Sequence, residues 1–286
     1  MPELPEVETI ARGLAHRVVG DVIESVWLGS KPEPLKSKAS EIVAALESRR
    51  IAGVRRVGKH IVFDLQADGS ARRPAKKRGA GKRRWQAATP AQWIVHLGMT
   101  GQMLVSRPEA EIARHTHAVA RLASGRELRF VDPRRFGRLS VAQGFEAAGH
   151  EPLEVELDHF RTLFRGRKTP IKSALLNQKL LRGVGNIYAD ESLFRAGIRP
   201  RRRAASLSRP ELERLFTAIR EVLKEAIALG GSSVSDYVDA DGEEGFFQLK
   251  HRVYGREGEP CLSCKTPIKR IVIGGRSSHY CPACQK

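Results

Sequence analysis

The chain has 286 residues, of which 41% are hydrophobic, so it is long enough for two domains with separate cores. Lys and Arg number 50 against 32 Asp and Glu, giving a formal net charge of +18 at pH 7. No segment approaches the roughly 20 apolar residues of a membrane span, and the N-terminus carries acids where a signal peptide carries Lys or Arg. We therefore expect a cytoplasmic protein with a polyanionic partner, foremost nucleic acid; a basic surface kept for solubility or ribosome association is the alternative.

The first predicted element is an amphipathic helix that begins near Pro5 and ends at Gly20. Its apolar residues Val7, Ile10, Leu14 and Val18 recur near helical spacing. Short apolar runs follow at 22–28, 61–65, 93–99, 117–122 and 127–131. They predict an antiparallel β-sandwich or barrel.

A basic insertion at 66–92 interrupts this pattern. Residues 71–84 hold eight Lys or Arg and no acid. We interpret the segment as a mobile loop between two strands, which either adds salt-sensitive DNA affinity or is a solvated insertion without function.

Beyond a domain boundary near residue 150 the pattern becomes helical. Candidate helices cover 158–164, 170–181, 186–195 and 208–229. A loop rich in Gly, Ser and Asp at 230–245 then leads to the cysteines.

The four cysteines form two C-x2-C pairs, Cys261 with Cys264 and Cys281 with Cys284, separated by sixteen residues. This spacing is typical of a site with four thiolate ligands for Zn²⁺. Such a set leaves no open position on the metal, so we predict one structural zinc ion on a basic hairpin.

A tight corner is predicted between two helices at Gly183 and Gly185. Asn186 is a favourable N-cap for the second helix, and Arg182 lies beside it. Backbone N–H groups at a helix start attract anions, so the corner is either an anion site or a helix hairpin made for packing.

The N-terminus reads Met1-Pro2-Glu3. Removal of Met1 would leave Pro2 with a free secondary amine, which is a nucleophile because an α-amino group is neutral more often than a lysine. Glu3 could act as a general acid. Many proteins begin in this way, so the three residues alone carry little weight.

Seven segments in order make the chain resemble the family of formamidopyrimidine-DNA glycosylase and endonuclease VIII. They are MPELPEVET, VGKHIVFDL, HLGMTG, DPRRFG, GVGNIYADESLF, VYGREGEPC and YCPACQK. The resemblance implies an α+β multidomain fold: an N-terminal antiparallel β-sandwich domain at 1–145, a helix-two-turn-helix domain with a lesion-recognition loop at 153–245, and a zinc-ribbon-like finger at 250–286. It implies a bacterial base excision repair enzyme that acts as a monomer on damaged double-stranded DNA, in the nucleoid.

The resemblance also assigns catalytic roles. The amine of Pro2 attacks C1′ of the damaged nucleotide, Glu3 protonates the sugar ring oxygen, and Lys59 donates a proton during β-elimination. Arg276 matches the arginine assigned to δ-elimination; since arginine hardly deprotonates, we expect it to bind phosphate and stabilise charge. Without the resemblance, Lys59 is an ordinary lysine at a strand edge.

Further residues match positions that contact DNA. Met99, Arg134 and Phe136 match an inserted trio that fills the space left by the extruded nucleotide. For Met99 and Phe136, core packing is the alternative. The complete set of expected DNA contacts is His96, Met99, His115, Arg134, Phe136, Arg167, Asn186 and Tyr254.

The sequence departs from the pattern of this family at two places that bear on which lesion is excised. Ser235 and Asp236 replace residues that are often basic or hydroxylated in relatives, and the basic insertion is longer than usual. We expect excision of oxidised purines such as 8-oxoguanine and formamidopyrimidines. An endonuclease VIII-type enzyme for oxidised pyrimidines and a non-catalytic zinc-finger DNA-binding protein are the alternatives.

Overall fold

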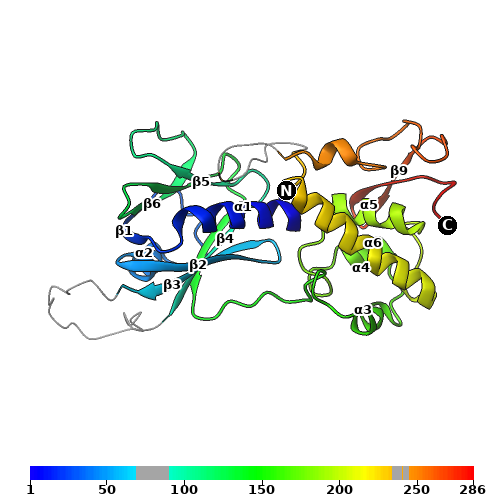
Figure 1. Cartoon of the computed structure of the whole chain (residues 1–286), viewed down its shortest axis with the longest axis horizontal. Coiled ribbons are helices and arrows are strands. Elements are labelled where there is room, and N and C mark those ends of the chain that lie inside the picture. Colours follow the sequence, from blue (N-terminus) through cyan, green and yellow to red (C-terminus); the bar gives the residue numbers. More distant parts are fainter. Residues whose placement is uncertain (69–89, 234–239, 241–244) are drawn as a thin grey trace. The chain divides into compact units, whose positions relative to one another are not determined.

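The computed structural model describes residues 1–68, 90–233, 240 and 245–286. They form two compact units (Figure 1). Unit 1 contains residues 1–2, 7–68, 90–146 and 240, and unit 2 contains residues 3–6, 147–233 and 245–286. Most of the predicted basic insertion and of the predicted recognition loop, including Ser235 and Asp236, lies outside the described residues.

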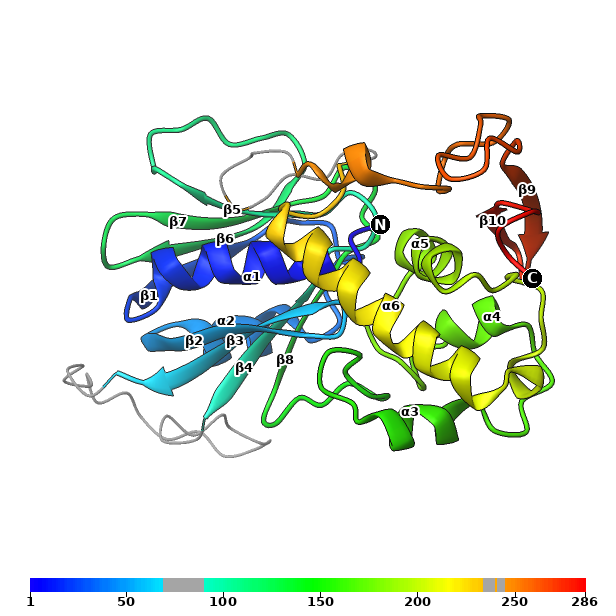
Figure 2. The ribbon, with the colours of Figure 1, turned by 45° about the vertical axis from the view of Figure 1, so that its right-hand side comes forward.

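Unit 1 is built on an eight-stranded antiparallel sheet in the order β5-β7-β6-β1-β2-β3-β4-β8. Only two residue pairs join β1 to β2, so the sheet divides into two four-stranded halves. Figure 2 shows β5, β6 and β7 on one side of helix α1 and β2, β3, β4 and β8 on the other, which confirms the predicted sandwich. The strands are β1 (Val22–Leu28), β2 (Arg49–Val57), β3 (His60–Ala67), β4 (Ala91–His96), β5 (Gln102–Ser106), β6 (Thr116–Leu122), β7 (Glu127–Val131) and β8 (Arg138–Ala142).

Helix α1 (Leu4–Val18) confirms the first predicted element. Its apolar face, including Ile10 and Leu14, is buried with Phe63, Trp93 and Phe130 in a single core. The first turn of α1 belongs to unit 2 and the rest to unit 1. A second helix, α2 (Ala39–Leu46), was not predicted, because it is short and its N-cap residue makes no side-chain capping bond.

Unit 2 is mainly helical. The predictions for 158–164, 186–195 and 208–229 are confirmed, and the longest helix begins with a capping box between Ser208 and Glu211. The prediction for 170–181 was wrong beyond residue 175, because the Asn177 side chain accepts a hydrogen bond from Lys179 N at 3.0 Å and favours a turn. The elements are α3 (Leu157–Phe164), α4 (Ile171–Leu175), α5 (Asn186–Ala196), η1 (Ala204–Ser206), α6 (Arg209–Ala228), η2 (Phe247–Lys250), β9 (Lys269–Ile273) and β10 (Arg276–Tyr280).

The core of unit 2 packs α5 against α6, with Tyr188, Leu193 and Leu215 fully buried. Leu4, from the start of the chain, is buried in the same core. Strands β9 and β10 form an antiparallel hairpin that carries Arg276 at the start of its second strand. Among the described residues, no helix combines the length and apolar character needed to cross a membrane.

Candidate active site

The start of α5 is a corner in which the chain passes very close to its own N-terminal segment. Gly183 has a positive φ of 94°, and its carbonyl accepts a hydrogen bond from Leu4 N at 3.0 Å. Gly185 has an ordinary φ of −130°, yet a Cβ at this position would lie 2.1 Å from Glu3 Cδ. Only glycine at position 185 leaves room for the Glu3 carboxylate.

The carboxylate of Glu3 caps α5. It accepts hydrogen bonds from Ile187 N at 3.3 Å and Tyr188 N at 3.5 Å, and the side chain is buried. The prediction that Asn186 is the N-cap was wrong: Gly185 occupies that position and Asn186 is the first helical residue. The predicted anion site thus exists, but the anion is the chain's own carboxylate. The two backbone N–H groups fix the carboxyl group at the start of the helix.

Glu6 is a second buried carboxyl beside Glu3, and the sequence reasoning missed it. It accepts hydrogen bonds from Glu3 N at 2.7 Å, from Ser232 N at 2.9 Å and from the Tyr188 hydroxyl. Burial, and then the nearby charge of Glu3, raises the pKa of Glu6 to about 7. One signal was present: an acid three residues into a helix can accept a hydrogen bond from the backbone before it.

A buried ion pair joins α4, α5 and β10. Lys172 Nζ lies 2.7 Å from Asp190 Oδ1, and both side chains are fully buried. Lys172 also donates to Ser277 O at 2.5 Å, and Asp190 accepts from His279 N at 2.9 Å. Burial lowers the pKa of Lys172, and Asp190 opposes that change. The pair fixes the hairpin that carries Arg276 to α5.

The second acid on α5, Glu191, fixes the position of Tyr254. Glu191 accepts hydrogen bonds from the backbone N–H groups of Arg252, Val253 and Tyr254 at 2.8 to 3.0 Å. Burial raises the pKa of Glu191. Sequence reasoning missed Lys172, Asp190 and Glu191, because nothing in their local pattern distinguishes them from ordinary helix residues.

Four of the predicted residues lie together in unit 2. The Asn186 amide donates to Ser277 Oγ at 3.3 Å and forms a hydrogen bond with the Tyr254 hydroxyl. Burial raises the pKa of Tyr254, and the charges of Glu3 and Arg276 act on the same group. Glu3, Asn186, Tyr254 and Arg276 therefore share one polar cluster.

The four cysteines form the predicted metal centre. Their sulfur atoms all lie within 4.8 Å of one another. Cys261 and Cys284 sulfurs are 3.9 Å apart, and those of Cys264 and Cys281 are 3.4 Å apart. Tetrahedral zinc with four thiolates places its sulfurs about 3.8 Å apart, so the donor set fits one structural Zn²⁺.

Unit 1 brings Met99, Arg134 and Phe136 together on two loops, 97–101 and 132–137, which we call the paired loops. The Arg134 guanidinium lies over the Phe136 ring, 4.9 Å from its centroid. Met99 is 41% exposed and Phe136 is 52% exposed. Core packing, the alternative for these two residues, does not apply.

Lys59 and His96 lie near each other in unit 1. Lys59 follows Gly58 in the tight turn between β2 and β3, where Val57 pairs with His60. The His96 ring is 5.0 Å from that of His60, between ring centroids. Burial, together with the charges of His60, Arg138 and Lys59, lowers the pKa of His96 to about 4. His96 is therefore neutral at physiological pH.

The other predicted residues are distributed over both units. Pro2 is a buried residue of unit 1, whereas Glu3 belongs to unit 2. His115 is exposed on the loop before β6. Arg167 follows α3, where its Nε donates to Leu163 O at 2.5 Å, so its guanidinium is held at the end of that helix.

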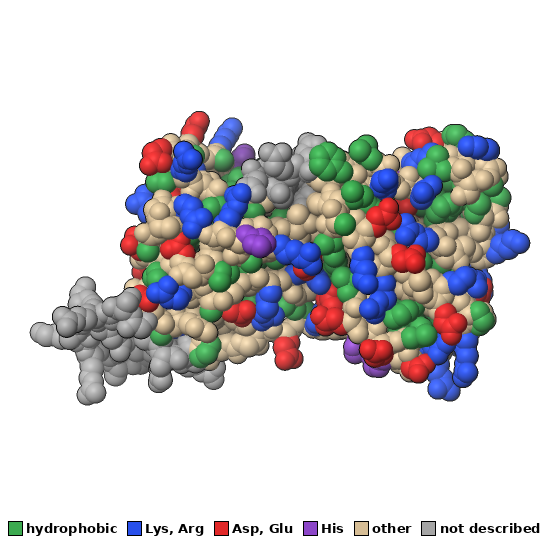
Figure 3. Space-filling model, in the orientation of Figure 1, with side chains coloured by type: hydrophobic (Ala, Val, Ile, Leu, Met, Phe, Trp, Pro, Cys, Tyr) green, Lys and Arg blue, Asp and Glu red, His purple; other side chains and the backbone are tan. Residues whose placement is uncertain are grey.

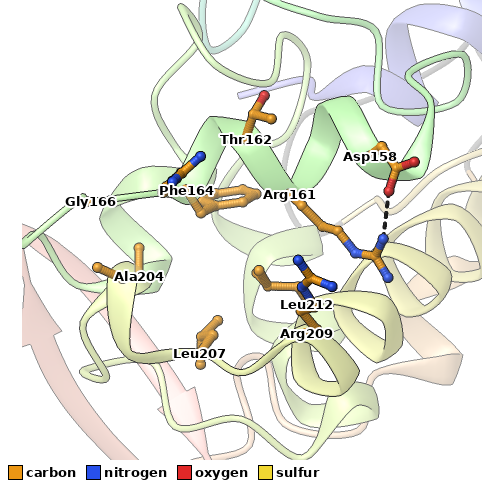
Figure 4. A pocket seen from close by; sticks show the side chains of 11 residues that line it. Asp158, Arg161, Thr162, Phe164, Gly166, Ala204, Leu207, Arg209 and Leu212 are labelled. Carbon is orange, nitrogen blue, oxygen red and sulfur yellow. Dashed lines mark hydrogen bonds and ion pairs between the residues drawn. The ribbon is translucent and has the colours of Figure 1, made fainter.

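On the face shown in Figure 3, Lys and Arg side chains are interspersed with Asp and Glu, so this view reveals no single basic patch. A hollow of about 490 Å³ lies between the end of α3 and the start of α6, lined by Phe164, Arg165 and Arg209 among others (Figure 4). Arg161 on its edge pairs with Asp158, and the described residues that line it include none of the predicted site residues.

Comparison with known proteins gives a consistent result over the whole chain. Residues 1–139 match the model of the formamidopyrimidine-DNA glycosylase N-terminal domain, and residues 148–238 match that of the formamidopyrimidine-DNA glycosylase H2TH domain. Residues 258–286 match the zinc finger found in FPG and IleRS.

Individual relatives match this chain over all or nearly all of their length. A formamidopyrimidine-DNA glycosylase of Solibacter usitatus is 43% identical over 296 residues, with complete coverage of both chains. The crystal structure of the MutM (FPG) protein from Thermus thermophilus shares 40% identity, covers 99% of this chain and 98% of its own, and has a TM-score of 0.82. The structure of a Lactococcus lactis FPG mutant with DNA that contains Fapy-dG shares 31% identity at full coverage of both chains, with a TM-score of 0.86. The chain belongs to the formamidopyrimidine-DNA glycosylase family.

Proposed function

We propose that the protein is a bifunctional DNA glycosylase and abasic-site lyase that removes oxidised purines during base excision repair. The observation that carries the proposal is the Glu3 carboxylate, which is buried, accepts hydrogen bonds from two backbone N–H groups of α5 and is covalently adjacent to Pro2. The DNA containing Fapy-dG that is bound to the Lactococcus lactis relative supports the substrate class.

The reaction begins at the N-terminal amine. With Met1 removed, the neutral nitrogen of Pro2 forms a bond to C1′ of the damaged nucleotide. The bond between C1′ and the oxidised base breaks, and the base leaves with the proton released by the Pro2 nitrogen. Glu3, in its acid form, protonates the ring oxygen, and the bond between that oxygen and C1′ breaks. A secondary amine gives a cationic iminium at C1′, which acidifies the C2′ proton.

Two eliminations then cut the DNA backbone. Loss of the C2′ proton expels the 3′ phosphate, with Lys59 as proton donor, and a second elimination expels the 5′ phosphate. Arg276 binds phosphate and stabilises charge, and the product is a one-nucleotide gap. Cys261, Cys264, Cys281 and Cys284 would hold a structural zinc ion that fixes the hairpin of Arg276 and has no open position for chemistry. We further propose that the enzyme acts as a cytoplasmic monomer on double-stranded DNA, with Met99, Arg134, Phe136, His96, His115, Arg167, Asn186 and Tyr254 as DNA contacts.

Borohydride trapping tests the proposal. The mature protein, verified by mass to lack Met1, is incubated with duplexes that carry 8-oxoguanine opposite cytosine or thymine glycol opposite adenine. We expect a covalent complex, weaker with Pro2→Gly and absent when Met1 is retained. Absence of trapping by mature protein would favour a binding protein without catalysis, and faster release of thymine glycol would favour an endonuclease VIII-type enzyme.

A further inference from the structure

Asp132 is a fully buried acid at the start of the second paired loop. Its Oδ1 accepts hydrogen bonds from Thr100 Oγ1 at 2.6 Å and from Arg134 N at 3.2 Å, and its Oδ2 accepts from Gly137 N at 2.7 Å. These donors are a hydroxyl and two backbone N–H groups. The charge is therefore stabilised by groups whose positions it fixes in return.

The donors belong to different loops. Thr100 lies in the turn between β4 and β5 that carries Met99, and Arg134 and Gly137 lie in the loop between β7 and β8 that carries Phe136. One carboxylate thus joins the two segments that present the exposed trio. The backbone of Asp132 extends the connection, since its N–H donates to His115 O at 2.9 Å and its carbonyl lies 3.0 Å from His117 Nε2.

The paired loops also touch through their backbones. A Cβ at Gly98 would lie 2.5 Å from Phe136 C and 2.6 Å from Gly137 N. Gly98 has a positive φ of 65°, which favours glycine there independently. Neither loop can shift without the other, and Asp132 supplies the hydrogen bonds at their junction.

We propose that Asp132 is a positioning residue for nucleotide extrusion, because its carboxylate locks the loops of Met99, Arg134 and Phe136 into one rigid unit. This inference rests on the proposed function. Extrusion of a nucleotide from a duplex costs a few kcal/mol, and ordering a loose loop at the same moment would add to that cost. Loops that are already ordered before DNA binds avoid the cost of ordering them during extrusion.

The test compares a step that needs extrusion with one that does not. Asp132→Asn keeps the size of the side chain but replaces one acceptor by a donor. Thr100→Val removes the hydroxyl, which donates to Asp132 and also accepts from Arg134 N at 3.4 Å, and Thr100→Ser, the matched control, retains it. Each variant is assayed for single-turnover excision of 8-oxoguanine from a duplex, for unstacking by the fluorescence of 2-aminopurine beside the lesion, and for cleavage at an abasic site in single-stranded DNA.

We expect Asp132→Asn and Thr100→Val to slow both excision from the duplex and the fluorescence change by about tenfold or more, the effect of one lost hydrogen bond to a charged group. Single-strand cleavage should stay within about twofold, and Thr100→Ser should match the parent protein. Equal slowing on both DNA forms, or duplex excision at the parent rate, would overturn the positioning role. Failure of the parent protein to excise 8-oxoguanine from the duplex would instead refute the proposed function, and the role with it.

Discussion

The paired loops of unit 1 and the polar cluster around Glu3 in unit 2 hold their predicted functional groups in opposite ways. In the paired loops the side chains of Met99 and Phe136 are exposed, and a buried carboxylate fixes the backbone beneath them. Around Glu3 the functional carboxyl itself is buried, and the backbone of α5 fixes it. The difference shows that a side chain expected to enter DNA needs a rigid backbone beneath it. A side chain expected to exchange a proton needs burial and fixed hydrogen-bond partners.

The largest effect that would sharpen this comparison is expected for Gly185→Ala. The added Cβ would overlap the Glu3 carboxylate, which must leave the start of α5. Since a positioned general acid contributes about a hundredfold or more, single-turnover excision should fall by at least about a hundredfold. Glu3→Gln should cause a similar loss.

Gly53→Ala is the matched control for Gly185→Ala. Neither glycine has a positive φ, but a Cβ at Gly53 meets no atom nearer than Asp64 Oδ2 at 3.9 Å. This variant should retain the parent rate. If Gly185→Ala excises as fast as Gly53→Ala, the position of Glu3 at the helix start has no part in the chemistry.

The sequence predicted best what depends on local spacing. The four cysteines, the start of the long helix at Ser208 and the glycine corner at Gly183 each depend on residues near one another in the chain, and the structure contains all three. The family resemblance supplied Met99, Arg134 and Phe136; for Met99 and Phe136 the sequence pattern alone favours core packing.

Contacts between distant segments could not be predicted. Glu3 and the start of α5 are more than 180 residues apart, so local capping rules favoured Asn186 and missed the carboxylate that caps the helix. The same limit applies to Glu6 with Ser232 and to Lys172 with Asp190, because a buried charge looks like a surface charge until its partner is known. Asp132 was missed as an anchor for the same reason.

Titration of Glu6, the buried carboxyl that accepts a hydrogen bond from Glu3 N, provides a smaller effect. Its pKa is raised to about 7 in the folded protein, so the folded state binds more protons than the unfolded state between about pH 4.5 and 7. The stabilising contribution is complete below the unfolded pKa and is lost as pH rises through about 7. From pH 5.5 to pH 7, the parent protein should lose roughly 1.5 kcal/mol of unfolding free energy relative to Glu6→Gln.

Denaturant unfolding of the two proteins across this pH range measures the difference. Glu6→Gln is its own control, because every other titrating group is common to both proteins. A constant difference between pH 5.5 and pH 7 would mean that Glu6 is already ionised throughout this range in the folded protein.

The smallest effect on stability is expected at Met99. Its side chain is 41% exposed on a loop held by other residues, so Met99→Ala should change the unfolding free energy by less than about 0.5 kcal/mol. Met103, the second residue of β5, is 1% exposed in the core of unit 1 and is the matched control; Met103→Ala should cost about 2 to 5 kcal/mol. Excision from the duplex should show the reverse order, with the loss at Met99, because only an exposed side chain on a rigid support can replace a nucleotide in the stack. Equal destabilisation by the two variants would show that Met99 packs as a core residue does. The paired loops would then not present exposed functional side chains on a buried support.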